Sequence, residues 1–166
     1  IFLIFPGLYL ALDYGIKFKS FIKNFLSTII ILGGFFYFYF LFGFSWIVSA
    51  FDYRSEMEIF KYLTLFGLPF LMLIFIIPSF IILTIFWDKK INKVLSLALC
   101  ISIGEFIRGN IFTGFSWNNF SHAFVVNDSL MQIFSVTGQY LATFLLVLTA
   151  QFIIFLWKKN DIFFAF

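Results

Sequence analysis

Two charged residues stand three positions apart near the end of an otherwise apolar stretch, Glu105 and Arg108 in the segment EFIRGNIFTGFSWNNF. Residues at this spacing share one face of a helix and can pair. A charged group surrounded by lipid costs at least ~2.5–3.5 kcal/mol unless it is paired or hydrated. Two interpretations follow: a structural ion pair, or a guanidinium that Glu105 orients toward the phosphate diester of a lipid headgroup. The sequence leaves both open.

The segment after this pair combines small, amide and aromatic residues, which predicts a loop at the membrane interface. Trp117 lies in this loop, and Trp46 closes another apolar stretch, as interfacial tryptophans do. Phe115, Trp117 and Phe120 alternate with small or amide residues, a pattern typical of an amphipathic surface segment. We therefore expect this segment to lie on the membrane surface.

Cys100 is the only cysteine, so an intramolecular disulfide and a cysteine-rich metal site are excluded. Ser96 and Gly104 lie four residues on either side of it, which places three small side chains on one helical face. Small residues at this spacing allow two membrane helices to approach closely. We predict that Cys100 is a packing residue, and that Gly138 and Ala142 make a similar close contact.

The composition identifies the solvent in which this chain folds. Mean hydropathy is +1.06, only 11% of residues are charged, and 30 of the 166 residues are Phe. Such a chain cannot cover a water-facing surface with polar atoms. We predict an all-α, polytopic transmembrane helix bundle of about five spans. They lie near 1–16, 24–51, 58–87, 91–112 and 130–157, and 162–166 opens a sixth.

The lysines indicate the orientation of these spans. They form three clusters: Lys17, Lys19 and Lys23; Lys89, Lys90 and Lys93; Lys158 and Lys159. Short positively charged loops stay in the cytoplasm, so residues 105–129 should face the opposite side. This placement explains the net charge of +3 without a nucleic-acid partner. The single histidine, His122, has no metal-ligating companions nearby in the sequence, and we expect no metal or cofactor.

Two further features have structural explanations. Pro69 and Pro78 lie within the third predicted span, where each removes a backbone donor and bends the helix. Asp13 and Lys17 are four residues apart at a predicted helix end, which favours an ion pair between them.

Several motifs together resemble those of a known family. Glu105-Phe-Ile-Arg108 followed by Thr113-Gly-Phe-Ser-Trp-Asn118 is similar to the E-(W/F)-L-R and T-G-F-P-W-N signature in the membrane part of bacterial apolipoprotein N-acyltransferases. The glycine- and aromatic-rich stretch 33–47 and the segment Ser135-Val-Thr-Gly-Gln-Tyr140 also resemble that family. The order and spacing agree over roughly 33–142.

This resemblance implies an integral inner-membrane enzyme. It would transfer an acyl chain from a phospholipid to the N-terminal cysteine of a diacylated lipoprotein, so its partners would be both lipid-anchored substrates and the bilayer. In that family a Glu-Lys-Cys triad in a nitrilase-like soluble domain performs the chemistry. Residues 1–166 would be a transmembrane fragment truncated at both ends, with that domain expected after 166 and no catalytic residue here.

The resemblance also suggests which residues form the floor of an acyl-chain groove beneath the active site. These substrate-binding candidates are Trp46, Glu105, Arg108, Thr113, Gly114, Trp117 and Asn118. Two other functions stay open, a small-solute or lipid transporter in which Glu105 would be a coupling carboxylate, and a non-catalytic membrane scaffold.

Overall fold

The computed structural model describes residues 3–52, 56, 58–88, 93–112 and 114–152, and this part is helical with connecting loops and no strand. An all-helical fold is what a bilayer favours, because a helix satisfies its backbone polar groups internally. The α-helices are α1 (Ile4–Gly15), α2 (Phe21–Thr28), α3 (Gly34–Gly43), α4 (Glu58–Asp88), α5 (Lys93–Asn110), α6 (Asp128–Met131) and α7 (Ile133–Ala150). A π-helical segment, η1 (Ile29–Gly33), joins α2 to α3, and the 3₁₀ segments are η2 (Ser45–Phe51) and η4 (Phe120–Val126).

Three stretches in the described part are long and apolar enough to cross a membrane: Phe21–Gly43, Glu58–Trp87 and Ile133–Ala150. They confirm a membrane-helix architecture and match three of the predicted spans. The predicted spans 1–16 and 91–112 correspond to α1 and α5, but α5 carries Lys93, Glu105 and Arg108 and is less apolar. The total of about five spans stays a prediction. The sixth span at 162–166 and four of the lysines, Lys89, Lys90, Lys158 and Lys159, lie outside the described residues.

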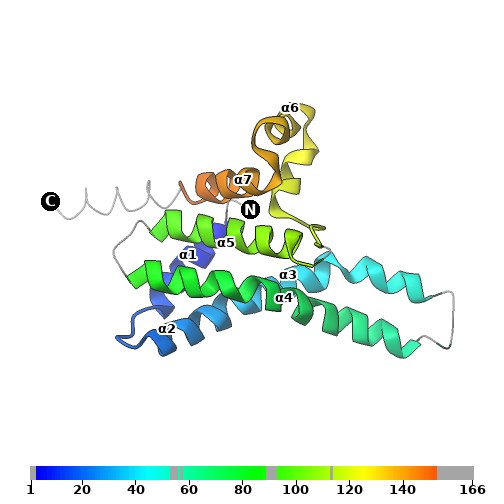
Figure 1. The fold of residues 1–166 in the computed structure, drawn as a ribbon, viewed down its shortest axis with the longest axis horizontal. Helices are drawn as coiled ribbons and strands as arrows, with labels where there is room; N and C mark the ends of the chain where they lie inside the picture. The colour runs from blue at the N-terminus through cyan, green and yellow to red at the C-terminus, as the bar shows by residue number, and fades with distance from the viewer. Residues whose placement is uncertain (1–2, 53–55, 57, 89–92, 113, 153–166) are drawn as a thin grey trace.

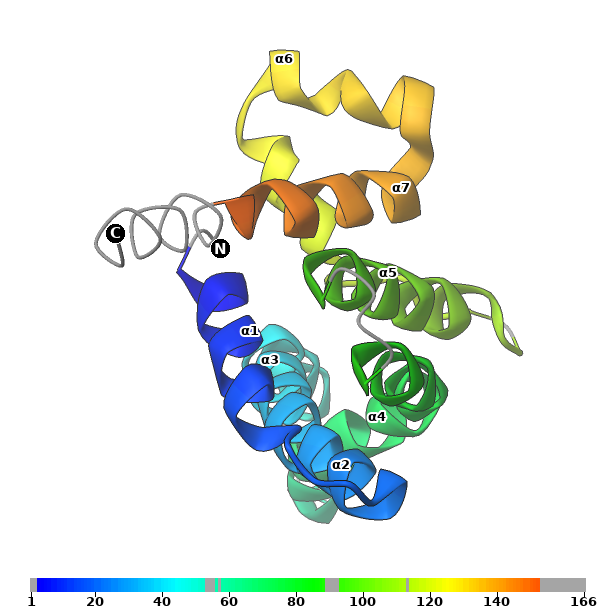
Figure 2. The same ribbon diagram turned by 90° about the vertical axis from the view of Figure 1, so that its left-hand side faces the viewer.

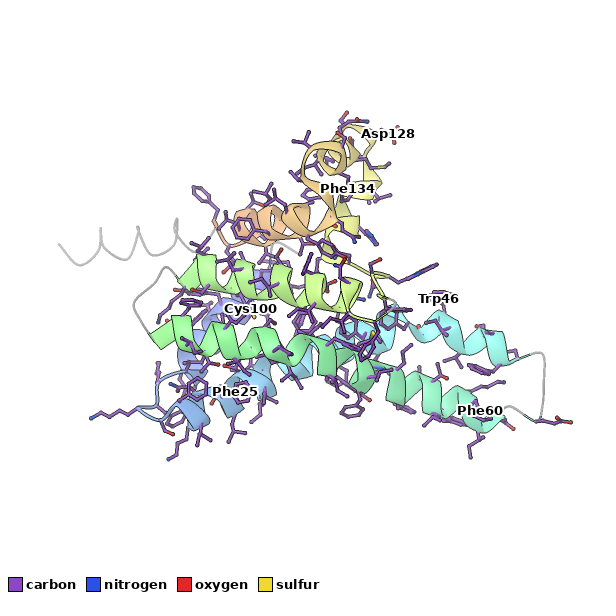
Figure 3. All side chains as sticks on the ribbon, viewed as in Figure 1. Phe25, Trp46, Phe60, Cys100, Asp128 and Phe134 are labelled. Atoms are coloured by element: carbon purple, nitrogen blue, oxygen red, sulfur yellow. The ribbon has the colours of Figure 1, made fainter. Side chains whose placement is uncertain are left out.

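Helix α5 lies between α4 and α7, and the long α3–η2 and α4 segments run side by side (Figure 1). Figure 2 shows α1, α3, α4, α5 and α7 from a second side, and buried apolar side chains of these helices form one cluster. Its fully buried side chains include Phe36, Phe40, Phe80, Leu97 and Ile101. The α6 region projects from the side of this bundle, with Asp128 at its tip (Figure 3).

The predicted small-residue face of α5 is confirmed. Cys100 is fully buried on the side of α5 that faces α4 (Figure 3), and its Sγ lies 3.3 Å from the carbonyl oxygen of Ser79. A Cβ on Gly104 would lie only 2.9 Å from Ser79 Oγ and 3.1 Å from Ile76 Cγ2. The absence of that atom lets the two helices touch.

Because Cys100 packs against α4 and donates only a weak S–H hydrogen bond to the Ser79 carbonyl oxygen, Cys100→Ala should lower the free energy of unfolding by about 1 kcal/mol. Thermal denaturation of the purified protein in detergent measures this loss. A Cys100→Ala variant that no longer folds, or that loses far more stability than this, would contradict the packing role.

One sequence prediction about helix packing was wrong. Gly138 makes no close contact, since a Cβ there would meet nothing within 4 Å. Instead its backbone (φ 63°, ψ 178°) interrupts α7, so the predicted span 130–157 is not one straight helix. A backbone in this region of φ/ψ space is nearly restricted to glycine. Ala142, after the break, is fully buried, and its close contact with another helix stays a prediction.

The Asp13–Lys17 pair was also wrong, because Asp13 pairs with Lys93 at the start of α5 and thereby links α1 to α5. The ammonium group of Lys17 lies over the ring of Tyr14, 4.8 Å from its centroid. Pro69 and Pro78 are both inside α4, whose axis changes direction along its length (Figure 1).

Candidate functional site

Glu105 and Arg108 form an ion pair that is completely enclosed by protein. Both side chains have no exposed surface, and Arg108 Nη2 donates a hydrogen bond to Glu105 Oε2. Placing them three residues apart on α5 brings their side chains to the same face. The guanidinium also lies over the Phe40 ring of α3, with its central carbon 5.1 Å from the ring centroid. The pair is therefore inside the bundle rather than at its surface.

Arg108 holds the loop that follows α5 through that loop's backbone. Its Nη1 donates to the carbonyl oxygens of Phe115 at 2.5 Å and Trp117 at 2.9 Å. The carbonyl oxygen of Arg108 in turn accepts the N–H of Phe115 at 3.0 Å. A planar guanidinium with several fixed donors suits this task, which a single ammonium group cannot reproduce.

Asn119 connects this pair to α7. Its Nδ2 donates to Glu105 Oε2 at 3.0 Å, and its Oδ1 accepts from the Thr143 hydroxyl on α7 at 2.5 Å. The same Oδ1 accepts from the backbone N–H and the hydroxyl of Ser121, at 2.9 and 2.7 Å. The buried network thus joins α5, the loop, η4 and α7. Two of its atoms, Glu105 Oε1 and Arg108 Nε, are buried and have no hydrogen-bond partner among the residues that the structure describes.

The loop follows a path that needs glycine and asparagine at two positions. Gly114 has φ +72°, and a Cβ there would lie 2.3 Å from the carbonyl oxygen of Gly109. Asn118 has φ +56°, a left-handed conformation that asparagine tolerates better than most residues. Asn118 packs against the end of α3, where a Cβ on Gly43 would lie 1.9 Å from its Nδ2. The hydroxyl of Tyr39 on α3 donates to the Asn118 carbonyl oxygen at 2.9 Å.

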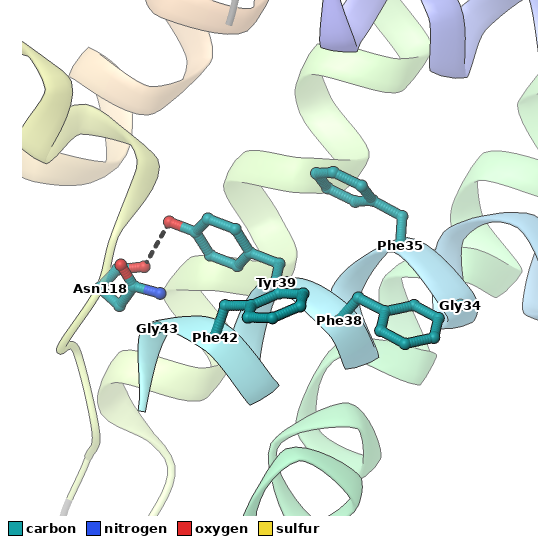
Figure 4. Close-up of a pocket in the computed structure, with 7 residues that line it drawn as sticks. All are labelled: Gly34, Phe35, Phe38, Tyr39, Phe42, Gly43 and Asn118. Atoms are coloured by element: carbon teal, nitrogen blue, oxygen red, sulfur yellow. Dashed lines mark hydrogen bonds between the residues drawn. The ribbon is translucent and has the colours of Figure 1, made fainter. Parts of the chain in front are cut away.

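A largely apolar groove of about 560 Å³ lies along α3 beside this loop (Figure 4). The groove is open on one side, since Phe38 and Phe42 in its lining are 57% and 74% exposed. The groove is lined by Gly34, Phe35, Phe38, Tyr39, Phe42, Gly43 and Asn118. Of these, only Tyr39 and Asn118 bring polar side-chain atoms.

A second, smaller cavity of about 190 Å³ shares Phe35, Tyr39 and Asn118 with the groove and is also lined by His122. Partial burial, and then the positive charge of Arg108, lower the pKa of His122. The imidazole is therefore neutral at neutral pH. Within the described residues no group of three or more His, Cys, Asp or Glu side chains could hold a metal ion.

The structure brings most of the predicted site residues together. Trp46 and Trp117 are both more than half exposed, and their ring centroids are 5.5 Å apart. Gly114 and Asn118 shape the loop that Arg108 holds, whereas Thr113 lies outside the described residues.

The predicted surface segment is corrected at Phe120, which is only 6% exposed. Its ring stacks on Tyr39 with centroids 4.3 Å apart, so it anchors the loop in the core.

Sequence reasoning missed Asn119, Thr143 and Tyr39. Asn119 is the second residue of an Asn-Asn pair, and nothing in the sequence indicates which of the two amides donates to the Glu105 carboxylate. Tyr39 stood among many aromatic residues of α3. Its distinguishing property is a hydroxyl that crosses to the loop, and this depends on the fold.

The comparisons with known proteins agree on one family. The model for the apolipoprotein N-acyltransferase N-terminal domain matches residues 2–152. An apolipoprotein N-acyltransferase of Bradyrhizobium diazoefficiens is 38% identical over 95 residues, which are 55% of this chain and 18% of that protein. No solved structure matches the chain.

Two further relatives carry the same name. The one from Rhodopseudomonas palustris is 34% identical over 112 residues, covering 66% of this chain and 20% of that protein. The one from Rickettsia typhi is 31% identical over 125 residues, covering 74% of this chain and 25% of that protein. The chain thus spans about a fifth to a quarter of the length of these relatives.

The match over 2–152 includes the buried Glu105–Arg108 pair, the loop it holds and the groove beside that loop. The chain belongs to the apolipoprotein N-acyltransferase family, within the N-terminal membrane-helix domain.

Proposed function

We propose that this chain is the membrane domain of an enzyme that transfers an acyl chain from a phospholipid to the N-terminal cysteine of a diacylated lipoprotein, the last step of lipoprotein maturation. The observation that carries the proposal is the apolar groove along α3, which ends at a loop fixed by a buried ion pair. An acyl chain is the kind of ligand that fits against phenylalanine rings and into the space that glycines leave free.

In this proposal the acyl-transfer chemistry belongs to residues outside the chain, in a soluble catalytic domain that follows residue 166. The short share of each relative that the chain covers supports this division. A cysteine that forms a thioester needs acid–base partners. Cys100 does not meet this need, because it is fully buried against Ser79.

The site residues would act by shaping the groove and its rim. Gly114 and Asn118 give the loop its path, and Thr113 belongs to the same loop. Trp46 and Trp117 would form an aromatic rim at the membrane interface. Because Glu105 and Arg108 are enclosed and bonded to the loop, a structural ion pair is favoured over direct binding of a headgroup.

The enzyme would reside in the bacterial inner membrane as a multi-pass protein, with both substrates anchored in the same bilayer. The lysine-rich loops would be cytoplasmic, and residues 105–129 would lie at the periplasmic end. The groove would then open near the leaflet that holds the lipoprotein substrate.

The function is tested by expressing the full-length protein in a bacterium depleted of its own apolipoprotein N-acyltransferase. Mass spectrometry of the N-terminal peptide of an abundant lipoprotein should show a third acyl chain on the cysteine nitrogen. Accumulation of the diacylated form, despite normal membrane insertion, would reject the proposal.

The proposed topology predicts which residues are accessible from outside the cell. In a Cys100→Ala background, Glu56→Cys and Asn127→Cys should react with a membrane-impermeant thiol reagent added to intact cells. Lys19→Cys should react only after the cells are permeabilised. Labelling of Lys19→Cys in intact cells, together with protection of Glu56→Cys, would show the opposite orientation.

A further inference from the structure

The groove along α3 lies between two glycines, Gly34 and Gly43. They are nine residues apart on one helix, which separates them by roughly 13 Å along its axis at about 1.5 Å per residue. Phe38 and Phe42 lie between them on the same groove wall (Figure 4). The groove is thus elongated, with a shape suited to a single extended apolar chain.

The two ends of the groove differ in polarity. At the Gly43 end the loop brings in Asn118, whose backbone carbonyl is held by the Tyr39 hydroxyl. At the Gly34 end the neighbouring lining residues are Phe35 and Phe38. An acyl ester therefore fits with its polar atoms near Asn118 and its terminal methyl group near Gly34.

The Gly34 end is also open. A Cβ at Gly34 would meet no atom within 4 Å, so this glycine is not required for helix packing. Gly43 differs, because a Cβ there would collide with Asn118. The absence of a side chain at Gly34 leaves free the space in which the end of a long acyl chain would lie.

We propose that Gly34 determines the length of the acyl chain that the groove accepts. The inference rests on the proposed function and adds a specificity-determining residue to it. A larger side chain at position 34 occupies the open end of the groove, and its Cβ meets no atom of the bundle within 4 Å. Short chains still fit between that side chain and Asn118, whereas long chains do not.

The test uses the full-length protein with Gly34→Leu and a matched control, Gly7→Leu. Gly7 is on α1, is exposed, does not line the groove, and a Cβ there also meets nothing within 4 Å. Acylation is measured with phosphatidylethanolamines that carry dodecanoyl, tetradecanoyl, hexadecanoyl or octadecanoyl chains. Gly34→Leu should lower the ratio of octadecanoyl to dodecanoyl transfer roughly tenfold or more. Gly34→Ala should give a smaller change, and Gly7→Leu none.

A second readout is independent of turnover. Native mass spectrometry of protein reconstituted with an equimolar mixture of the four lipids reports which chains are retained. Gly34→Leu should retain shorter chains than the wild type and Gly7→Leu do. If the wild-type protein does not acylate but this shift is present, the proposed function fails and the length selection stands.

Either of two results would overturn the proposal about Gly34. The first is an unchanged profile of retained lipids in a folded Gly34→Leu variant. The second is an equal loss of retention for all four chain lengths, which would mean that the groove is blocked and not shortened.

Discussion

Arg108→Ala is expected to lower the free energy of unfolding by about 3–5 kcal/mol, because it leaves the carboxylate of Glu105 buried without its cationic partner. The carbonyl oxygens of Phe115 and Trp117 lose their donor in the same step. Thermal denaturation in detergent and the yield of monodisperse protein measure the loss.

A surface ion pair in the same protein gives the matched control. Lys61 Nζ lies 2.7 Å from Asp52 Oδ1, and both side chains are partly exposed. Exposed pairs contribute about 0–1 kcal/mol, so Lys61→Ala should change stability little. An equal effect of Lys61→Ala and Arg108→Ala would contradict the importance of burial.

The double replacement Glu105→Gln with Arg108→Gln separates charge from hydrogen bonding. It removes both charges, so part of the stability lost in Arg108→Ala should return. The recovery should be incomplete. The guanidinium of Arg108 donates to the side chain at position 105 and to two loop carbonyl oxygens, and a glutamine amide has too few N–H groups to replace all of these hydrogen bonds. Full loss in the double variant would show that the loop contacts, and not the charge pairing, carry the stability.

The same variants test what Arg108 does for the proposed acyl transfer. If it acts by holding the loop, acylation per folded molecule should fall in Arg108→Lys and in Arg108→Ala alike, while Glu105→Gln should have a smaller effect. Normal acylation by a well-folded Arg108→Ala variant would defeat a role in substrate binding altogether.

The sequence was sufficient to predict features that depend on local spacing. Hydropathy predicted the long helices, and the i, i+3 spacing brought Glu105 and Arg108 together. The four-residue spacing of Ser96, Cys100 and Gly104 predicted a close contact, although it did not identify α4 as the partner. Such predictions hold because a helix fixes which of its own residues share a face.

Features that depend on tertiary contacts were not predictable in the same way. Local spacing suggested Lys17 as the partner of Asp13, but Lys93, eighty residues away, competes for the same carboxylate once α1 and α5 meet. The four-residue spacing of Gly138 and Ala142 suggested a packing glycine, and only the backbone angles of Gly138 show that it interrupts a helix. The alternation of Phe120 with small and amide residues placed it at the surface. That local pattern could not reveal that its ring stacks on Tyr39.

The loop itself illustrates how the two kinds of information combine. The motif predicted a loop after α5. In the structure the carbonyl oxygens of Phe115 and Trp117 and the side chain of Asn119 point inward, toward Arg108 and Glu105. Asn119, and not Asn118, meets the carboxylate, while Asn118 faces the groove and Gly43. Two adjacent amides therefore have different tasks: one holds the loop to the bundle, and the other forms the polar end of the groove.

Gly114→Ala should disrupt this loop without removing any polar contact. The new methyl group would lie 2.3 Å from the carbonyl oxygen of Gly109, a backbone atom of α5 that cannot turn away as a side chain can. The left-handed backbone at Gly114, φ +72°, adds strain for any residue with a Cβ. Together these effects should cost about 2–4 kcal/mol. They should move the carbonyl groups that Arg108 binds, so acylation by the full-length protein should fall by roughly tenfold or more.

Two alanine variants make this result specific to the loop. Gly138→Ala introduces backbone strain alone, since φ is +63° but no atom lies within 4 Å, so it should destabilise less than Gly114→Ala. Gly7→Ala on α1 introduces neither strain nor a clash and should leave stability unchanged or raise it by about 0.5–1 kcal/mol, because alanine favours a helix more than glycine does. Equal stability and acylation in all three variants would mean that the loop tolerates displacement. Its attachment to Arg108 would then not position the groove, because a loop that can move freely cannot fix the polar end of a binding site.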